Sequence, residues 1–219
     1  MRDNPRVTAT QDLRNPVFAR LWSVMTRNEP RELRRHREEL LAGLSGRVLE
    51  LGPGTGSNFP HYPATVDEVV AVEPEPYMRR RACQAAARAP VRIDVVAGVA
   101  DRLPVDDASC DAAVASLVLC SVPDPDRALA ELHRVLRPDG ELRFYEHVLA
   151  GRPGLARVQR ALDRAFWPRA FGGCHAGRDT PAAIAAAGFA IEARRSLWFG
   201  PRTIPSPTGP HVIGRARRR

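Results

Sequence analysis

A short segment in the first third of the chain has the residue types and spacing of a ligand-binding turn. It runs from Glu50 to Gly56, reads Glu-Leu-Gly-Pro-Gly-Thr-Gly, and closes an apolar run that starts at Val48. The glycines allow a sharp turn and a close approach to a ligand that a Cβ would block. A second acid, Glu73, ends the next apolar run at 69–72, where its carboxylate can accept both hydroxyls of a ribose. Together these residues predict a site for a nucleotide-like cofactor.

The spacing of the glycines distinguishes between two kinds of cofactor. Gly52, Gly54 and Gly56 form a Gly-x-Gly-x-Gly pattern, whereas dinucleotide-binding proteins have Gly-x-Gly-x-x-Gly. Glu50 precedes the first glycine by two residues, and an acid there can balance the cationic groups of an aminoacyl sulfonium, which a pyrophosphate lacks. The pattern therefore favours S-adenosylmethionine, with S-adenosylhomocysteine as its product. A nicotinamide cofactor and a purely structural loop are the alternatives.

The elements that would position this site alternate between strands and helices from Gly46 onward. Near-continuous apolar runs such as 112–119 are typical of parallel strands that are buried on both faces. Their alternation with helical segments predicts a Rossmann-like, doubly wound α/β sheet. We expect strands at about 47–51, 68–73, 91–97, 111–117, 141–147, 189–195 and 210–216, and helices at about 16–27, 30–43, 57–61, 76–88, 126–136, 155–167 and 180–188.

The length of 219 residues suits one large α/β domain. We expect residues 1–45 to form an N-terminal helical cap and 46–219 to form the α/β domain, the two making one structural unit. The apolar face of the helix at 16–27 would pack on the core, with a lid over the cofactor or an interfacial membrane contact as alternatives. The Arg and Glu residues of the helix at 30–43 are interpreted as a solvated face. A Gly-rich breaker at 151–154 precedes an amphipathic, lid-like helix.

The net charge of +8 comes from arginine alone, because the chain contains no lysine. Four of these arginines lie in the last five residues and are interpreted as a solvated tail. No stretch interleaves aromatic residues with positive charge, so the sequence argues against a nucleic-acid partner. No apolar run approaches the roughly 18 to 20 residues of a membrane span, and the N-terminus lacks a signal-peptide pattern. We therefore expect a cytoplasmic protein without a transmembrane segment.

The four cysteines, Cys83, Cys110, Cys120 and Cys174, contain no Cys-x-x-Cys pair. That spacing argues against zinc ligation and against a disulfide framework. We expect free thiols and no bound metal. Cys120 and Cys174 could be mistaken for nucleophiles, but a small buried residue is the default interpretation of each.

Five segments of the chain resemble the class I S-adenosylmethionine-dependent methyltransferases. More narrowly, Leu-Val-Leu-Cys-Ser-Val at 117–122, Glu-His-Val at 146–148, Gly173-Cys174 and Arg178 resemble the methyltransferase-like family that includes the animal membrane-associated alkyl thiol S-methyltransferases and their bacterial relatives. The animal enzymes carry an apolar N-terminal anchor that this chain lacks, so membrane association is not expected. The resemblance covers about residues 16–216, and its five segments are 48–56, 69–74, 117–122, 134–140 and 144–148.

The resemblance implies a seven-stranded sheet whose last strand is antiparallel, with the cofactor across the carboxyl ends of strands one, two and four. Glu50 and the glycines would surround the methionine part, Glu73 the ribose, and the turn 74–78 one face of the adenine. Many class I members carry an Asp where this chain has Val99, so either Asp101 substitutes or backbone groups recognise the adenine. The residues implied to bind the cofactor are Glu50, Gly52, Pro53, Gly54, Gly56, Asn58, Glu73, Pro74, Met78, Val99, Ala100, and Ser116 and Leu117, which would offer backbone carbonyls.

Methyl transfer from a sulfonium is an in-line displacement, so the protein mainly aligns the reacting atoms in a dry pocket. A thiol of pKa about 8.5 is already a few per cent thiolate at neutral pH, whereas an aliphatic hydroxyl needs a positioned base. His147 follows the fifth strand at its carboxyl tip and is the first candidate for a catalytic role in the acceptor pocket, with a structural hydrogen bond as the alternative. Glu146, His61 and His175 are further candidates.

Aromatic side chains outnumber polar groups in the segments expected to cap the site. They predict an apolar pocket for a small hydrophobic acceptor. A thiol acceptor is slightly favoured over the oxygen or nitrogen of a phenol, quinol, lipid or specialised metabolite. A nucleic-acid methyltransferase and a cofactor-binding protein without methyl transfer are weaker hypotheses. The aromatic residues are Trp22, Phe166, Trp167, Phe171, Trp198 and Phe199.

Overall fold

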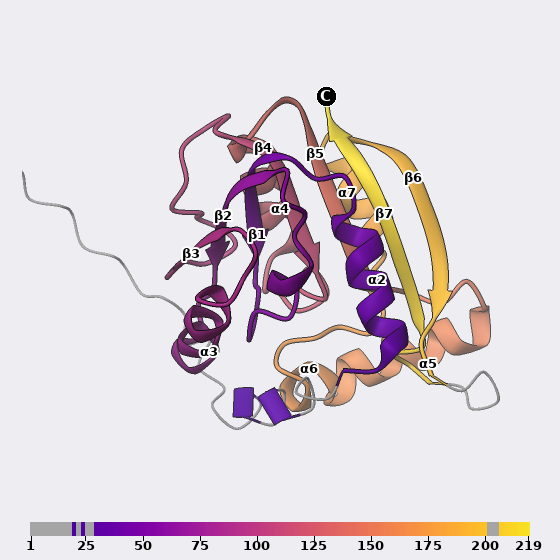
Figure 1. The fold of residues 1–219 in the computed structure, drawn as a ribbon. Helices are drawn as coiled ribbons and strands as arrows, with labels where there is room; N and C mark the ends of the chain where they lie inside the picture. The colour runs from indigo at the N-terminus through magenta and orange to yellow at the C-terminus, as the bar shows by residue number, and fades with distance from the viewer. Residues whose placement is uncertain (1–18, 21–22, 25–28, 201–205) are drawn as a thin grey trace, which may run out of the picture.

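A seven-stranded sheet runs through the middle of the protein (Figure 1). The computed structural model describes residues 19–20, 23–24, 29–200 and 206–219. The strand order is β3-β2-β1-β4-β5-β7-β6, and β7 is antiparallel to both of its neighbours. The predicted doubly wound sheet with an antiparallel last strand is therefore confirmed. The strands are β1 Gly46–Leu51, β2 Val66–Val72, β3 Arg92–Val96, β4 Cys110–Ser116, β5 Leu136–His147, β6 Phe189–Trp198 and β7 Pro210–Arg218.

The strand order reverses at β1, which pairs with β2 on one side and with β4 on the other. In open α/β sheets a ligand binds at this switch point, outside the carboxyl ends of the strands. The glycine segment at 52–56 follows β1 directly, and Glu73 follows β2. The fold thus brings both halves of the predicted cofactor site to one edge of the sheet.

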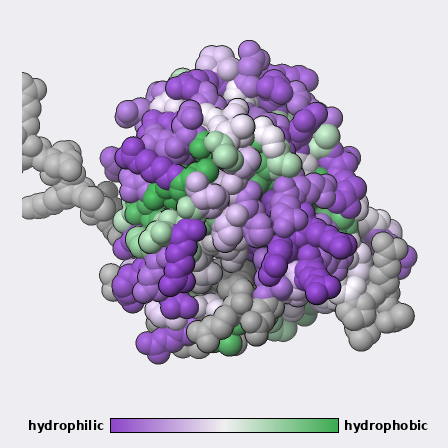
Figure 2. Space-filling model, in the orientation of Figure 1, coloured by the Kyte–Doolittle hydropathy of each residue, from purple (hydrophilic) through white to green (hydrophobic). Residues whose placement is uncertain are grey.

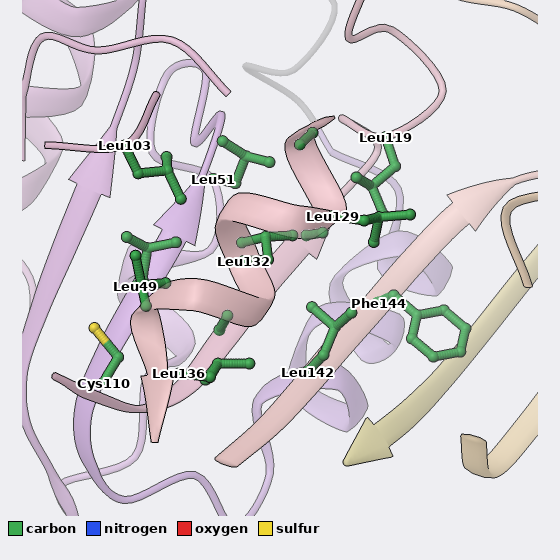
Figure 3. Packing of buried hydrophobic residues seen from close by; sticks show 14 of the residues in the cluster. Leu49, Leu51, Leu103, Cys110, Leu119, Leu129, Leu132, Leu136, Leu142 and Phe144 are labelled. Atoms are coloured by element: carbon green, nitrogen blue, oxygen red, sulfur yellow. The ribbon is translucent and has the colours of Figure 1, made fainter. Parts of the chain in front are cut away.

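Helices cover both faces of the sheet. On one face, α4 (Pro125–Val135) and α7 (Thr180–Ala186) pack against the strands, and Leu129 and Leu132 of α4 meet Leu49 and Phe144 in a continuous apolar core (Figure 3). The other face is covered by α2 (Arg31–Leu41), η2 (Phe59–His61) and α3 (Pro76–Ala86). Two further helices, α5 (Pro153–Ala165) and α6 (Trp167–Ala170), lie together near one end of the sheet (Figure 1).

The start of β5 differs from the prediction. β5 begins at Leu136, directly after α4, and not at 141 after a turn. The chain stays in the sheet because Asp139 adopts a left-handed conformation, with φ of 61°, and the register with β4 shifts at the same place. Helix α7 starts at Thr180, as expected, and its N-cap is Asp179, whose side chain accepts a hydrogen bond from the Ala182 N–H.

The final arginines are not a solvated tail. Arg217 and Arg218 lie in β7, where they pair with β6, and the Arg217 guanidinium also donates to Glu192 at 2.6 Å. β7 lies between β5 and β6, but its alternate residues Arg215 and Arg217 keep their side chains partly exposed and pair with Glu192, so the run of charge did not look like a strand.

The N-terminal helix predicted at 16–27 lies mostly outside the described residues, Trp22 among them. Residues 19–20 and 23–24, which are described, are helical. The division into a cap at 1–45 and an α/β domain at 46–219 stays a prediction. Among the described residues, no helix is both long and apolar enough to span a membrane. The face of the molecule shown in Figure 2 is mostly hydrophilic, with small hydrophobic patches.

Candidate active site

The turn after β1 has a conformation that requires glycine. Gly52 and Gly54 both have φ of 60°, and Gly56 has φ of 85°. A Cβ on Gly52 would lie 2.4 Å from Val118 Cγ2, and one on Gly56 would lie 2.7 Å from the ring of Phe59. The turn is therefore packed closely against its neighbours, while its backbone follows a path that side-chain-bearing residues rarely adopt.

Glu73 joins the end of β2 to this turn. The side chain is buried, its Oε2 accepts a hydrogen bond from the Gly54 N–H, and its Oε1 accepts one from the Glu75 N–H, both at 2.9 Å. Burial raises the pKa of Glu73 to about 7, against the lowering effect of these two bonds. Each carboxylate oxygen keeps a second lone pair. The carboxylate can therefore still accept two ribose hydroxyls.

The buried acid gives the first testable prediction, a pH dependence of cofactor affinity. With a pKa of about 7 in the free protein, Glu73 would be roughly 90% ionised at pH 8 and roughly 10% at pH 6. Because the ionised form is the better acceptor, affinity for S-adenosylhomocysteine should fall about tenfold between pH 8 and pH 6. Calorimetric titration across this range measures it. Glu73→Gln should remove the pH dependence of affinity, whereas the control Glu68→Gln, at the other end of β2, should retain it. A wild-type pH dependence in Glu73→Gln would show that Glu73 is not the group that titrates.

Glu50 lies at the centre of a buried polar network beside the glycine turn. Its Oε1 accepts from Asn58 Nδ2 at 2.7 Å and its Oε2 from the Tyr62 hydroxyl at 2.8 Å. Burial raises the pKa of Glu50 to about 7, although Tyr62, Asn58 and the positive charge of Arg37 each lower it. The acid at the tip of β1 therefore holds Asn58, another predicted cofactor residue, in a fixed orientation.

Arg37 is a residue of this site that the sequence interpretation missed. It was expected on a solvated face of α2, but it is only 5% exposed. Its Nε donates to Glu29 at 2.6 Å, and its Nη1 donates to Asn58 Oδ1 at 2.7 Å and to Ser116 Oγ at 3.3 Å. The guanidinium thus reaches residues that follow β1 and end β4, where the predicted site would hold the charged methionine part of the cofactor.

Replacing Arg37 should damage both stability and cofactor binding. Arg37→Ala leaves the carboxylate of Glu29 without its partner, and breaking a buried ion pair in this way costs about 3 to 5 kcal/mol of unfolding free energy. We also expect a loss of about 10- to 100-fold in affinity for S-adenosylhomocysteine, as for other positioning residues. Urea unfolding and calorimetry measure the two effects. Arg35→Ala, an exposed position on the same helix, is the control, and equal effects of the two variants would refute a special role.

The residues that follow β4 include a strained backbone position. Leu117 has φ of 56°, which a leucine rarely adopts, and its N–H donates to the Tyr145 carbonyl at 2.7 Å. Strain of this kind is concentrated at functional sites, because the surrounding structure must impose it. The strand therefore turns sharply between Ser116 and Leu117, the two residues expected to offer carbonyls to the cofactor.

The predicted adenine residues lie beyond β2 and β3. Met78, near the start of α3, is buried, and Val99 and Ala100 are half-buried in the segment after β3, where Val99 bridges to Arg102. Asp101, the alternative to the missing family Asp, is exposed.

The acceptor side of the site follows β4 and β5. Glu146 is fully buried, and its carboxylate accepts from the backbone N–H groups of Val118, Leu119 and Cys120 at 2.9 to 3.3 Å. His147 Nε2 lies 2.8 Å from Cys174 Sγ, and Cys120 lies close to both. All four cysteines are free thiols, as predicted.

The pKa values in this cluster move in opposite directions. A hydrogen bond from Cys174 lowers the pKa of Cys120 well below its usual range, with burial opposing and His147 assisting. The same hydrogen bond, together with burial, raises the pKa of Cys174. Burial lowers the pKa of His147, but the charge and hydrogen bond of Cys120, a backbone hydrogen bond and the charge of Asp163 together raise it above its usual value. The cluster therefore favours a thiolate on Cys120 beside a protonated imidazole.

The other predicted polar candidates do not join this cluster through their side chains. His61 lies 3.7 Å from Glu38, and His175 lies 3.9 Å from Asp163. Burial lowers the pKa of both histidines.

Aromatic residues lie nearby, as predicted. Trp167 stacks on Phe171 with centroids 4.1 Å apart, and Phe166 is half exposed beside them. A cavity of about 330 Å³ with mostly apolar walls is lined by the segment that follows β5 and by the adjoining ends of β6 and β7, which contribute Trp198 and His211.

The arrangement fits S-adenosylmethionine. The glycine turn presents backbone at the switch point, and Glu73 keeps free lone pairs there. Strand order and site together define a class I S-adenosylmethionine-dependent methyltransferase. The sequence profile of the methyltransferase domain family matches residues 49–144.

Two human relatives identify the family within the class I methyltransferases. The chain is 34% identical over 218 residues to thiol S-methyltransferase TMT1B of Homo sapiens, a match that covers 94% of this chain and 88% of that one. It is 35% identical over 178 residues to the human thiol S-methyltransferase TMT1A, covering 78% and 72%. The chain therefore belongs to this methyltransferase family and is an S-adenosylmethionine-dependent enzyme, as predicted.

Solved structures agree on the fold. A methyltransferase from Thermotoga maritima, described as a possible histamine N-methyltransferase, superposes with a TM-score of 0.65 over 95% of this chain and 98% of that one. At 21% identity this likeness concerns the fold alone.

Proposed function

We propose that the protein transfers the methyl group of S-adenosylmethionine to the sulfur of a small apolar thiol. One observation supports this acceptor most directly: at the end of β5, the carboxylate of Glu146 and the Nε2 atom of His147 already have partners within the protein. Glu146 accepts three backbone N–H groups, and Nε2 of His147 contacts Cys174. An aliphatic hydroxyl acceptor would need a free base in this position, whereas a thiol does not. The names of the two human relatives point to the same acceptor.

Different residues would bind different parts of the cofactor and the acceptor. Glu73 and the glycine turn would hold the ribose and methionine parts, Arg37 and Asn58 would orient the methionine end, and His147 would border the acceptor. S-adenosylmethionine supplies a methyl group on a sulfonium. The acceptor sulfur forms the new S–C bond while the C–S bond of the sulfonium breaks, and the thiol proton leaves to solvent. Alignment in a dry pocket is the main contribution of the protein.

The apolar surroundings favour a hydrophobic acceptor. The stacked pair Trp167 and Phe171 and the half-exposed Phe166 flank the loop that carries Cys174. Aromatic walls bind an aryl or alkyl group without demanding a polar partner. A small-molecule acceptor, no nucleic-acid partner and a cytoplasmic location remain parts of this proposal.

A matched acceptor series tests the function. Isotopically labelled S-adenosylmethionine is offered with thiophenol, phenol and aniline, which share a ring and differ in the nucleophilic atom. We expect thiophenol turnover to exceed phenol turnover by at least about 100-fold near neutral pH, because the thiol supplies its own thiolate. Glu73→Ala, prepared in parallel, excludes a contaminating enzyme. Good methylation of phenol or aniline with negligible methylation of thiophenol would reject the thiol assignment.

A further inference from the structure

Three side chains that can bind a metal ion meet beyond the carboxyl ends of β4 and β5. Cys120 lies in the turn after β4, His147 is the last residue of β5, and Cys174 lies in the loop after α6. The two Sγ atoms and one ring nitrogen all lie within 4.8 Å of one another. All three residues are less than 10% exposed. The fold therefore gathers two thiols and an imidazole from three distant segments, although the sequence spacing predicted no metal site.

We propose that Cys120, His147 and Cys174 bind Zn²⁺, and that the open fourth coordination position takes the sulfur of the acceptor thiol. Thiolate and imidazole are the usual ligands of zinc, and they disfavour Mg²⁺ and Ca²⁺, which prefer oxygen ligands. Three protein ligands with one open position are the pattern of catalytic zinc sites, whereas structural sites have four. The first half of the proposal concerns metal binding alone, and the second half rests on the proposed function.

The backbone around the cluster is fixed before any metal binds. Glu146 accepts from the Cys120 N–H, and the His175 N–H donates to the Cys120 carbonyl at 2.8 Å, so the two cysteine segments are joined directly. A Cβ on Gly173 would lie 2.8 Å from the Ser121 carbonyl oxygen, which shows how closely these segments approach. Supporting bonds of this kind orient metal ligands and strengthen binding.

The distances suit a tetrahedral ion after a small adjustment. Zn–S bonds of about 2.3 Å and Zn–N bonds of about 2.0 Å place tetrahedral ligand atoms roughly 3.5 to 3.8 Å apart. His147 Nε2 and Cys174 Sγ are now 2.8 Å apart, so their separation would increase by less than about 1 Å, which a side-chain rotation supplies. Two thiolates neutralise the charge of Zn²⁺. The buried cluster would then carry no net charge, which lowers the cost of its burial.

Zinc would also explain how a thiol is activated without a free base. A thiol that coordinates zinc loses its proton outright, here to water. The acceptor sulfur then forms a bond to the methyl carbon while the C–S bond of the sulfonium breaks, leaving S-adenosylhomocysteine and one released proton. The thioether product is neutral and a weaker ligand than the thiolate, so it leaves the coordination position.

The first experiment measures metal in the wild-type, full-length protein. We expect about one zinc per chain by mass spectrometry of protein purified without chelator or histidine tag. After chelation under a reducing agent, Co²⁺ should bind with the intense visible bands of a tetrahedral site and with thiolate-to-cobalt charge transfer. Zinc should also protect two of the four cysteines from a thiol reagent. Absence of zinc, together with weak octahedral cobalt bands in reduced protein, would overturn the proposal.

Substitutions then test the ligands. Cys174→Ser should weaken Co²⁺ binding by at least about 100-fold, because a direct ligand matters at least as much as its supporting bonds. Cys83→Ser removes an exposed thiol outside the cluster and should bind cobalt like the wild type. Circular dichroism checks that each variant folds. If Cys174→Ser does not fold, the protection experiment on wild-type protein decides the question, and equal cobalt affinity in a folded Cys174→Ser overturns the site.

The last experiment separates the metal site from the proposed function. Thiophenol added to the cobalt protein should shift the charge-transfer band, and phenol should not. A wild-type rate of thiol methylation in metal-free enzyme would overturn the role of zinc in activating the acceptor, while leaving both the metal site and the thiol acceptor standing. Bound zinc without any thiol methylation would leave the metal site standing and overturn the thiol acceptor. A cobalt spectrum that thiophenol does not change would reject the role of the fourth position.

Discussion

Replacing Gly54 by valine should reduce affinity for S-adenosylhomocysteine by at least about 1,000-fold, or about 4 kcal/mol. Gly54 has φ of 60°, where a β-branched residue is strongly strained, and its N–H donates to Glu73. Valine would therefore move both the turn and the carboxylate that the ribose needs. Calorimetric titration measures the affinity. A thermal shift gives a second readout, because a ligand that binds the folded state raises the melting temperature.

The matched control for this substitution is Gly43→Val. Gly43 also has positive φ, 75°, but no atom lies within 4 Å of its would-be Cβ. The control carries similar backbone strain, about 1 to 3 kcal/mol, at a position outside the cofactor site. It should lower the melting temperature and leave affinity unchanged. Wild-type-like binding by Gly54→Val, or no thermal shift of the wild type at millimolar cofactor, would refute the site.

The second large effect is expected at Glu146. Glu146→Ala leaves the N–H groups of Val118, Leu119 and Cys120 without their acceptor in a buried turn. At about 1 to 3 kcal/mol for each unsatisfied group, the unfolding free energy should fall by at least about 3 kcal/mol. In a protein of this size that corresponds to a drop of roughly 6 to 12 °C in melting temperature. Urea and thermal unfolding measure both values.

Glu146→Gln is the variant to compare with Glu146→Ala, because it keeps a hydrogen-bond acceptor at this position. The amide oxygen can still accept two of the three N–H groups, while its NH₂ faces a donor, so we expect a loss of about 1 to 2 kcal/mol. The turn that carries Cys120 should also become more mobile in Glu146→Ala, which faster amide hydrogen exchange at 118–120 would reveal. Equal stability of the two variants and the wild type would show that the carboxylate does not hold this turn.

The cofactor edge could be predicted from the sequence because its determinants are local. The three glycines lie within one five-residue segment that follows β1, and Glu73 follows β2. Because β1 and β2 pair in parallel, this pairing alone brings the two segments together. Arg37 could also have been found. Leu33 and Leu40 lie four residues before and three after it, which puts Arg37 on the buried face of α2, but a run of charged residues concealed that pattern.

The acceptor cluster could not be predicted from spacing. Cys120, His147 and Cys174 are separated by 27 residues at each step, and their meeting depends on the loop after α6 folding back onto the turn after β4. No periodicity encodes such a contact. Short metal motifs are recognisable because one turn holds two ligands, and here each ligand comes from a different element.

Two acids buried beside the glycine turn affect folding as well as binding. Glu50 and Glu73 each have a pKa of about 7 in the folded protein and 4.5 when exposed. Below pH 4.5 both are protonated in either state; as pH rises toward 7, the unfolded chain ionises first, and each acid lowers the free energy of unfolding by about 3 kcal/mol. These two acids should therefore make the ligand-free protein less stable at neutral pH than in mild acid. A cofactor that binds the ionised form restores part of the lost free energy of unfolding. The ligand-free enzyme therefore loses stability at its cofactor site, and cofactor binding compensates for part of that loss.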